Sequence, residues 1–126
     1  HHYSAAHPSV ENDSFVTAFR KANNGMRPNY FGLGGYDGMN LIAAALKKTN
    51  GDPDGLKLVE AMKGASWISP RGPVSIDPDT RDIIQNVYLR KVERRSDGLY
   101  NVEFETVAKV KDPALGKNWN SLRQKI

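Results

Sequence analysis

Cysteine is absent from the sequence, which excludes disulfide bonds, thiolate metal sites and cysteine nucleophiles but leaves the cellular compartment open. Long apolar runs are absent too, since none approaches the roughly 20 residues that a membrane-spanning helix requires. The chain opens without an initiator methionine and without the pattern of a signal peptide. We therefore expect a processed or truncated product, and His1 is compatible with a tag remnant.

The composition suits one globular domain with a hydrophobic core, because 39% of the 126 residues are hydrophobic and 9% are aromatic. The formal net charge is +4. Part of the excess lies at the end, where Lys111, Lys117, Arg123 and Lys125 stand against Asp112 alone. Regular interleaving of aromatics and glycines is missing there. We therefore predict a solvated basic tail over residues 112–126 and no nucleic-acid partner.

The first half of the chain has a helical pattern. Apolar residues at spacings of three and four predict helices at about Val10–Ala22, Tyr36–Lys48 and Asp54–Lys63. Tyr3–Ala6, before the first helix, is expected to be a short strand or strand exit. The residues expected to face inward from the second and third helices are Met39, Ile42, Ala43, Leu46, Leu56, Val59 and Met62.

The second half has a strand pattern. A connector over Ser66–Pro78 precedes two β-rich segments, Ile83–Val92 and Leu99–Val110. The Asp97-Gly98 pair between these two segments predicts a β-hairpin. Pieces of an α/β layer followed by a hairpin suit a chain that crosses between two lobes better than a self-contained small domain.

A glycine-rich stretch, Gly32–Gly38, lies directly before the second predicted helix and contains Tyr36 and Asp37. A dinucleotide-binding fingerprint requires glycine at its sixth position and a parallel strand after the helix. Here Asp37 occupies that position and another helix follows, which disfavours a nucleotide cofactor. The alternative is a loop at the lip of a cleft for a small organic ligand. Tyr36 then either lines the cleft or packs in the core, and Asp37 either receives an ammonium or caps the helix.

No constellation points to catalysis or metal binding. His1, His2 and His7 cluster without a fixed ligand spacing, which is better explained by a tag remnant and a capping histidine. Ser4 and Ser9 lack the partners of a catalytic triad. The predictions are no enzyme activity, no metal and no cofactor.

Four collinear stretches together carry a family resemblance: H-Y-S-A-A-H-P, E-N-D-S-F-V-T-A-F-R, G-G-Y-D-G-M-N-L-I-A-A-A-L and S-P-R-G-P-V-S-I-D-P-D-T-R-D-I-I-Q-N-V-Y-L-R-K-V. They resemble the C-terminal portion of type I periplasmic solute-binding proteins, the branched-chain amino acid-binding proteins of ABC importers. The resemblance covers Tyr3 to about Asp112. It implies a fragment of a fold with two Rossmann-like α/β lobes joined by three crossover strands.

On this template, residues 3–76 belong to the first lobe, 77–111 form the crossover and hairpin of the second lobe, and 112–126 form the basic tail. The resemblance implies an extracytoplasmic, periplasmic protein that binds an amino-acid-like solute by lobe closure and delivers it to ABC permease subunits. The ligand-contact residues carried over from the family are Tyr36, Gly35, Asp37 and Tyr3. A sensor domain of a signalling receptor and a nucleotide-dependent enzyme are the alternatives. Because the lobes are incomplete, uncovered helix faces predict self-association or docking of the missing part.

Overall fold

The computed structural model describes residues 1–112, and the basic tail predicted over 112–126 lies outside the described residues except for Asp112. Three helices come first, α1 (Val10–Ala22), α2 (Tyr30–Lys48) and α3 (Gly55–Met62). Four strands follow, β1 (Ser66–Ser69), β2 (Gly72–Ile76), β3 (Ile83–Arg95) and β4 (Gly98–Val110). They form one antiparallel sheet in the order β1-β2-β3-β4. The predicted combination of α/β pieces and a C-terminal hairpin is therefore confirmed.

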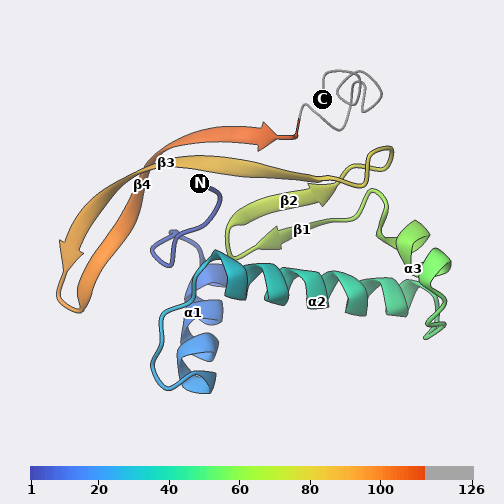
Figure 1. The fold of residues 1–126 in the computed structure, drawn as a ribbon, viewed down its shortest axis with the longest axis horizontal. Coiled ribbons are helices and arrows are strands. Elements are labelled where there is room, and N and C mark those ends of the chain that lie inside the picture. Colours follow the sequence, from blue (N-terminus) through green and yellow to red (C-terminus); the bar gives the residue numbers. More distant parts are fainter. Residues whose placement is uncertain (113–126) are drawn as a thin grey trace, which may run out of the picture.

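The arrangement is open and elongated. Helix α2 runs alongside β1 and β2, with α1 at its N-terminal end and α3 near its C-terminal end (Figure 1). The β3–β4 hairpin passes over this layer and continues beyond it as a two-stranded ribbon (Figure 1). Its two strands have 13 residues each, more than twice the usual strand length of about 5–6 residues.

Helix α2 begins six residues before the predicted start. The side-chain oxygen of Asn29, the N-cap residue, accepts hydrogen bonds from the backbone N–H groups of Phe31 and Gly32 at 3.0 and 3.1 Å. An asparagine N-cap satisfies amides that otherwise have no partner at a helix start. The Gly32–Gly38 stretch is consequently helical, and the predictions of a glycine loop and of an Asp37 cap are wrong.

Helix α1 has the predicted bounds, but its N-cap is Ser9 and not the predicted histidine. Asp54 caps α3 by accepting from the backbone N–H of Lys57 at 3.0 Å. The hairpin turns at Ser96-Asp97, with Gly98 paired to Arg95 in the register of β3 and β4. The predicted connector Ser66–Pro78 contains a hairpin of its own, since β1 and β2 pair around Pro70-Arg71.

The hydrophobic core of the described residues is small and lies where α1 meets α2. Tyr3, Phe15 and Leu33 form it, and Phe19 packs against it. The Tyr3 segment is not a strand: after the extended residues His1–Ser4 the chain turns, and the backbone N–H of His7 bonds the Ser4 carbonyl at 3.0 Å. The predicted strand is therefore absent, and the segment ends in a turn.

Several predicted core residues are exposed. On α2, Met39 is 64% exposed and Ile42 38%, whereas Leu33 and Ala45 are fully buried. On α3, Leu56 is 80% exposed. The prediction that Met39, Ile42 and Leu56 face inward is therefore wrong within the described residues, where nothing covers these side chains.

Candidate functional site

Tyr36 lies on α2 with its ring on the core and its edge in a hollow. The centroid of the Tyr36 ring is 4.8 Å from that of Phe15, yet the residue remains 46% exposed. The hollow has a volume of about 280 Å³. Its lining residues are Val10, Glu11, Ser14, Tyr36, Asp37, Asn40, Trp67, Ile68 and Pro70. The Tyr36 ring therefore contacts the core at Phe15 and the residue also lines a cavity, while its place in a solute cleft stays a prediction.

Asp37 lines the same hollow but is only 4% exposed. Its Oδ2 atom lies 3.0 Å from the Arg71 guanidinium and accepts a hydrogen bond from Ser69 Oγ at 2.8 Å. The indole N–H of Trp67 lies 3.4 Å from Oδ1. The carboxylate is thus already occupied by the β1–β2 turn, and it joins this turn to the middle of α2.

Sequence reasoning missed Arg71 as the partner of Asp37. The two residues are 34 positions apart, and no spacing rule connects a helix to a distant turn. Arg71 is 7% exposed and also donates to Gln85 Oε1 at 2.6 Å. Its backbone carbonyl accepts the Tyr88 hydroxyl at 2.6 Å. The turn is therefore held from two sides, by α2 and by β3.

Among residues 1–112, a close contact requires only one glycine of the α2 stretch. A Cβ on Gly32 would lie 2.8 Å from Cε2 of Phe19, so Gly32 allows α1 and α2 to approach. A Cβ on Gly35 would meet nothing within 4 Å, and the same holds for Gly34 and Gly38. Gly35, one of the predicted contact residues, is exposed beside Tyr36.

Tyr3 lies in the core, 3% exposed. Its hydroxyl donates to Asn12 Oδ1 at 3.0 Å, and its ring meets Phe15 edge-on at 6.2 Å. Burial, together with the nearby Glu103 carboxylate, raises the pKa of Tyr3. The phenol is therefore a neutral hydrogen-bond donor at any ordinary pH.

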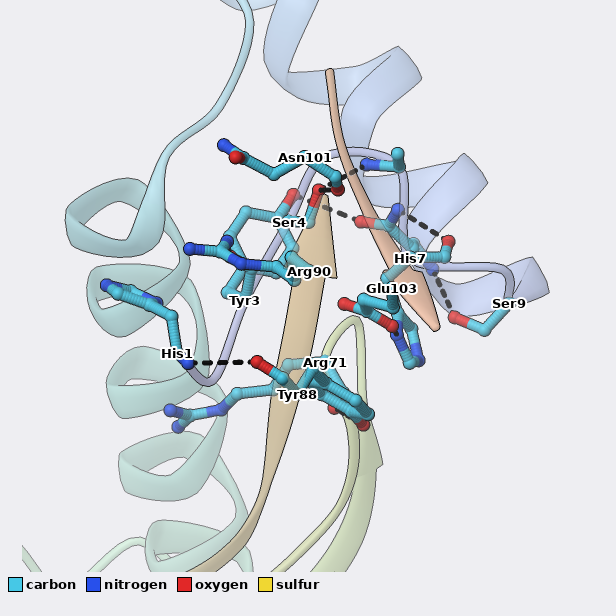
Figure 2. A network of polar contacts seen from close by, with 12 residues as sticks. His1, Tyr3, Ser4, His7, Ser9, Arg71, Tyr88, Arg90, Asn101 and Glu103 are labelled. Carbon is cyan, nitrogen blue, oxygen red and sulfur yellow. Dashed lines mark hydrogen bonds and ion pairs between the residues drawn. The ribbon is translucent and has the colours of Figure 1, made fainter. Parts of the chain in front are cut away.

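The segment around Tyr3 is fastened to the hairpin by a network of polar contacts (Figure 2). The backbone of His1 exchanges hydrogen bonds with that of Tyr88, at 2.8 and 3.1 Å. Arg90 donates to the Tyr3 carbonyl at 2.6 Å (Figure 2). Ser4 Oγ donates to the Asn101 carbonyl at 2.5 Å. The first residues of the chain thus lie along β3 and against β4.

His7 completes this attachment. Its Nδ1 atom lies 2.6 Å from Glu103 Oε2, and both side chains are about nine-tenths buried. His1 and His2 instead stack on each other at 4.7 Å, beside Tyr30. Burial, with Arg71 next in importance, lowers the pKa of His2. In the described residues no three potential metal-ligating side chains come together.

A second hollow, of about 310 Å³, lies between the first residues, the start of α2 and the hairpin. Its lining residues are His1, Tyr3, Ser4, Ala5, Arg27, Pro28, Asn29, Tyr30, Arg90, Leu99, Tyr100 and Asn101. The predicted site residues are thus divided. Tyr36 and Asp37 share the first hollow, while Tyr3 lines the second and connects to Tyr36 only through Phe15. Apart from Tyr3, sequence reasoning identified none of the second group, because these residues come from three separate segments.

None of the helices in the part of the chain that the structure describes is both long and apolar enough to cross a bilayer.

Comparison with known proteins shows relatives that are about three times as long. The Leu/Ile/Val-binding protein homolog 6 of Brucella abortus (strain 2308) is 48% identical over 116 residues, which are 90% of this chain and 30% of the relative. The crystal structure of a solute binding protein of an ABC transporter from Rhodopseudomonas palustris BisB5, in complex with 3,4-dihydroxy benzoic acid, is 57% identical with a TM-score of 0.86. The match covers 90% of this chain and 31% of that protein.

A second solved structure is also that of a solute binding protein of an ABC transporter. The solute binding protein of an ABC transporter from Rhodopseudomonas palustris HaA2, in complex with p-hydroxybenzoic acid, is 41% identical with a TM-score of 0.84. The match covers 94% of this chain and 32% of that protein. The family described as periplasmic binding protein matches residues 2–98. The expected resemblance is confirmed, and the chain belongs to the periplasmic binding protein family.

Proposed function

We propose that this chain is part of the extracytoplasmic solute-binding component of an ABC importer, which closes its lobes on a small organic solute and delivers it to permease subunits in the membrane. The observation that carries the proposal is the 57% identity, over 90% of the chain, to a solute binding protein of an ABC transporter. The family and these relatives are solute-binding proteins rather than enzymes. The amino-acid-like solute expected from the sequence is widened to include small aromatic acids, because two relatives are in complex with hydroxybenzoic acids.

The division into lobes is part of the proposal. Residues 3–76 then belong to the first lobe, and residues 77–111 supply the crossover and the hairpin of the second. The long ribbon of β3 and β4, which extends beyond the helical layer, is consistent with a segment that passes from one lobe to the other (Figure 1). A chain that spans about 30% of its relatives lacks most of both lobes.

The proposed contacts of this chain with the solute are Tyr36, Gly35, Asp37 and Tyr3. Tyr36 offers a half-exposed ring and a hydroxyl at a hollow, supported from behind by Phe15. Gly35 leaves space beside this ring. Asp37 is held in place by Arg71, so its proposed role is to fix the position of Tyr36 on α2 and to line the hollow. Tyr3 supports Phe15 from the opposite side.

The test uses the full-length parent protein, because an incomplete cleft cannot surround a ligand. Thermal unfolding and calorimetry are run with leucine, isoleucine, valine, benzoate, 4-hydroxybenzoate and 3,4-dihydroxybenzoate. We expect at least one to bind and to raise the unfolding temperature, as any ligand specific for the native state does. Absence of binding by every compound would overturn the proposed function. Unchanged affinity in Tyr36→Ala would remove Tyr36 from the site while leaving the function standing.

A further inference from the structure

The described arginines differ in their partners. Arg20 and Arg71 each pair with a carboxylate, that of Asp97 at 3.1 Å and that of Asp37 at 3.0 Å. Arg90 instead donates to a backbone carbonyl, and so does Arg27, whose Nη1 lies 2.7 Å from the Leu99 carbonyl. A neutral carbonyl accepts a hydrogen bond but carries no charge that pairs with the guanidinium. The Asp97 carboxylate is close enough to Arg27 that this arginine helps to lower the pKa of Asp97. Within residues 1–112, neither Arg27 nor Arg90 forms an ion pair.

These two arginines line the same hollow of about 310 Å³. No aspartate or glutamate belongs to its lining. The nearest acids are engaged elsewhere, since Asp97 pairs with Arg20 and accepts from Tyr100, and Glu103 pairs with His7. The hollow therefore has two arginines and no acid in its lining, and the Asp97 carboxylate lies outside the lining near Arg27.

Three tyrosines, Tyr3, Tyr30 and Tyr100, are among the residues that line the hollow. The guanidinium groups of Arg27 and Arg95 lie over the Tyr100 ring at 3.8 and 4.9 Å, whereas Tyr30 is at the first position of α2. The N-terminal end of a helix also carries a partial positive charge, which adds to that of the arginines. A volume of about 310 Å³ falls at the lower end of the range for ligand pockets, roughly 300–1,000 Å³. That size suits one small ring with a charged group.

We propose that the hollow between Arg27 and Arg90 binds the carboxylate of a small aromatic acid, with Tyr30 beside its ring. A guanidinium has five N–H groups in a planar fork and matches a carboxylate closely, so donors remain beyond those used on the backbone carbonyls. The inference rests on the proposed solute-binding function and names the part of the chain that takes the acid group. It does not depend on Tyr36, which lies in the other hollow.

The experiment measures binding of 4-hydroxybenzoate and of its neutral analogue 4-hydroxybenzamide to the full-length parent by calorimetry. Wild type is compared with Arg27→Met, Arg90→Met and the control Arg94→Met. Arg94 is an exposed arginine of the same hairpin and does not line the hollow, so the control removes the same charge elsewhere. We expect Arg27→Met and Arg90→Met each to weaken binding of the acid about tenfold or more, the control to stay within about twofold, and the amide to bind weakly to all.

Because Arg90 also donates a hydrogen bond to the Tyr3 carbonyl, the thermal unfolding of each variant is measured to check that it is folded. Arg90→Lys and Arg27→Lys retain the charge and should recover part of the affinity. Equal affinity of wild type and both methionine variants for the acid, in folded proteins, would overturn the inference while leaving the solute-binding function intact. Equal binding of acid and amide to wild type would do the same. Failure of wild type to bind any amino acid or organic acid would overturn both.

Discussion

The two faces of α2 differ in what covers them. One face is buried within the chain, where Leu33 and Ala45 are 0 and 1% exposed and Asp37 is held by the β1–β2 turn. The other face carries Met39 and Ile42, which are 64 and 38% exposed. The buried face is thus partly polar, whereas the exposed one is the more apolar. A helix that is apolar on most of its circumference is normally enclosed on several sides. The exposed face is therefore expected to contact protein that lies outside residues 1–112.

The largest effect should come from breaking the polar anchor on the buried face. Asp37→Ala in the parent leaves the Arg71 guanidinium buried without its partner, which costs about 3–5 kcal/mol in other proteins. Urea unfolding monitored by tryptophan fluorescence measures the loss. The double variant Asp37→Ala/Arg71→Met should be more stable than Asp37→Ala alone. A loss below about 1 kcal/mol would show that the pair is not an anchor.

The next effect compares the two faces directly. Leu33→Ala removes a fully buried side chain, and we expect a loss of about 2–5 kcal/mol in both the 126-residue chain and the parent. Met39→Ala should cost less than about 0.5 kcal/mol in the chain, as a surface change does. It should cost about 2 kcal/mol or more in the parent if the missing part covers this face. Equal effects of Met39→Ala in both proteins would contradict the comparison.

A smaller effect concerns association. The uncovered face predicts that the 126-residue chain forms dimers or larger species at micromolar concentration, because exposed apolar patches of this kind mediate contacts. Ile42→Lys should shift the sedimentation profile toward the monomer. A substitution of an already polar exposed residue, Lys47→Glu, serves as the control. Sedimentation of wild type as a folded monomer at all concentrations would be the contrary result.

The smallest effect lies at the far end of the ribbon, away from α2. The Tyr100 hydroxyl, followed by Arg20, holds the pKa of Asp97 below its ordinary value of 3.8. A lowered carboxyl pKa in the folded state means that its contribution to stability is complete above about pH 4 and is lost as the pH falls further. Asp97→Asn should therefore flatten the pH dependence of unfolding below pH 4 and change little at pH 7. If the pH dependence of unfolding below pH 4 were the same in Asp97→Asn and wild type, a contribution of Asp97 to stability would be excluded.

Local signals explain which parts of the fold the sequence could predict. The Asp97-Gly98 hairpin signal and the helical spacing in α1 are both decided by neighbouring residues, and the predicted hairpin and helix are confirmed. The start of α2 was predicted six residues too late because its four glycines indicated a loop. Asn29, which accepts two hydrogen bonds from the helix start, was not recognised as its cap. Glycine disfavours a helix by about 1 kcal/mol per residue but does not forbid it.

The candidate sites depend on contacts that no local pattern contains. The Asp37–Arg71 pair joins a helix to a turn 34 positions away, and Arg27 and Arg90 meet at one hollow from a loop and a strand. Such meetings follow from the path of the whole chain. Tyr36 was identified as a candidate by family resemblance, which does not depend on local sequence patterns. Its role as a solute contact stays a prediction.

The irregular pairing within the long hairpin has a mechanical consequence. The register of β3 and β4 shifts between Leu89 and Arg90, next to the attachment of Tyr3, and the turn at Asp97 lies seven residues further. At about 3.3 Å per residue this arm is roughly 20 Å long, so a rotation of about 10° at the shift moves the turn by roughly 4 Å. The contacts of Arg20 with Asp97 and of Arg27 with the Leu99 carbonyl oppose that movement, so a spin label or fluorophore at Ser96 would report a rotation of the ribbon that breaks them.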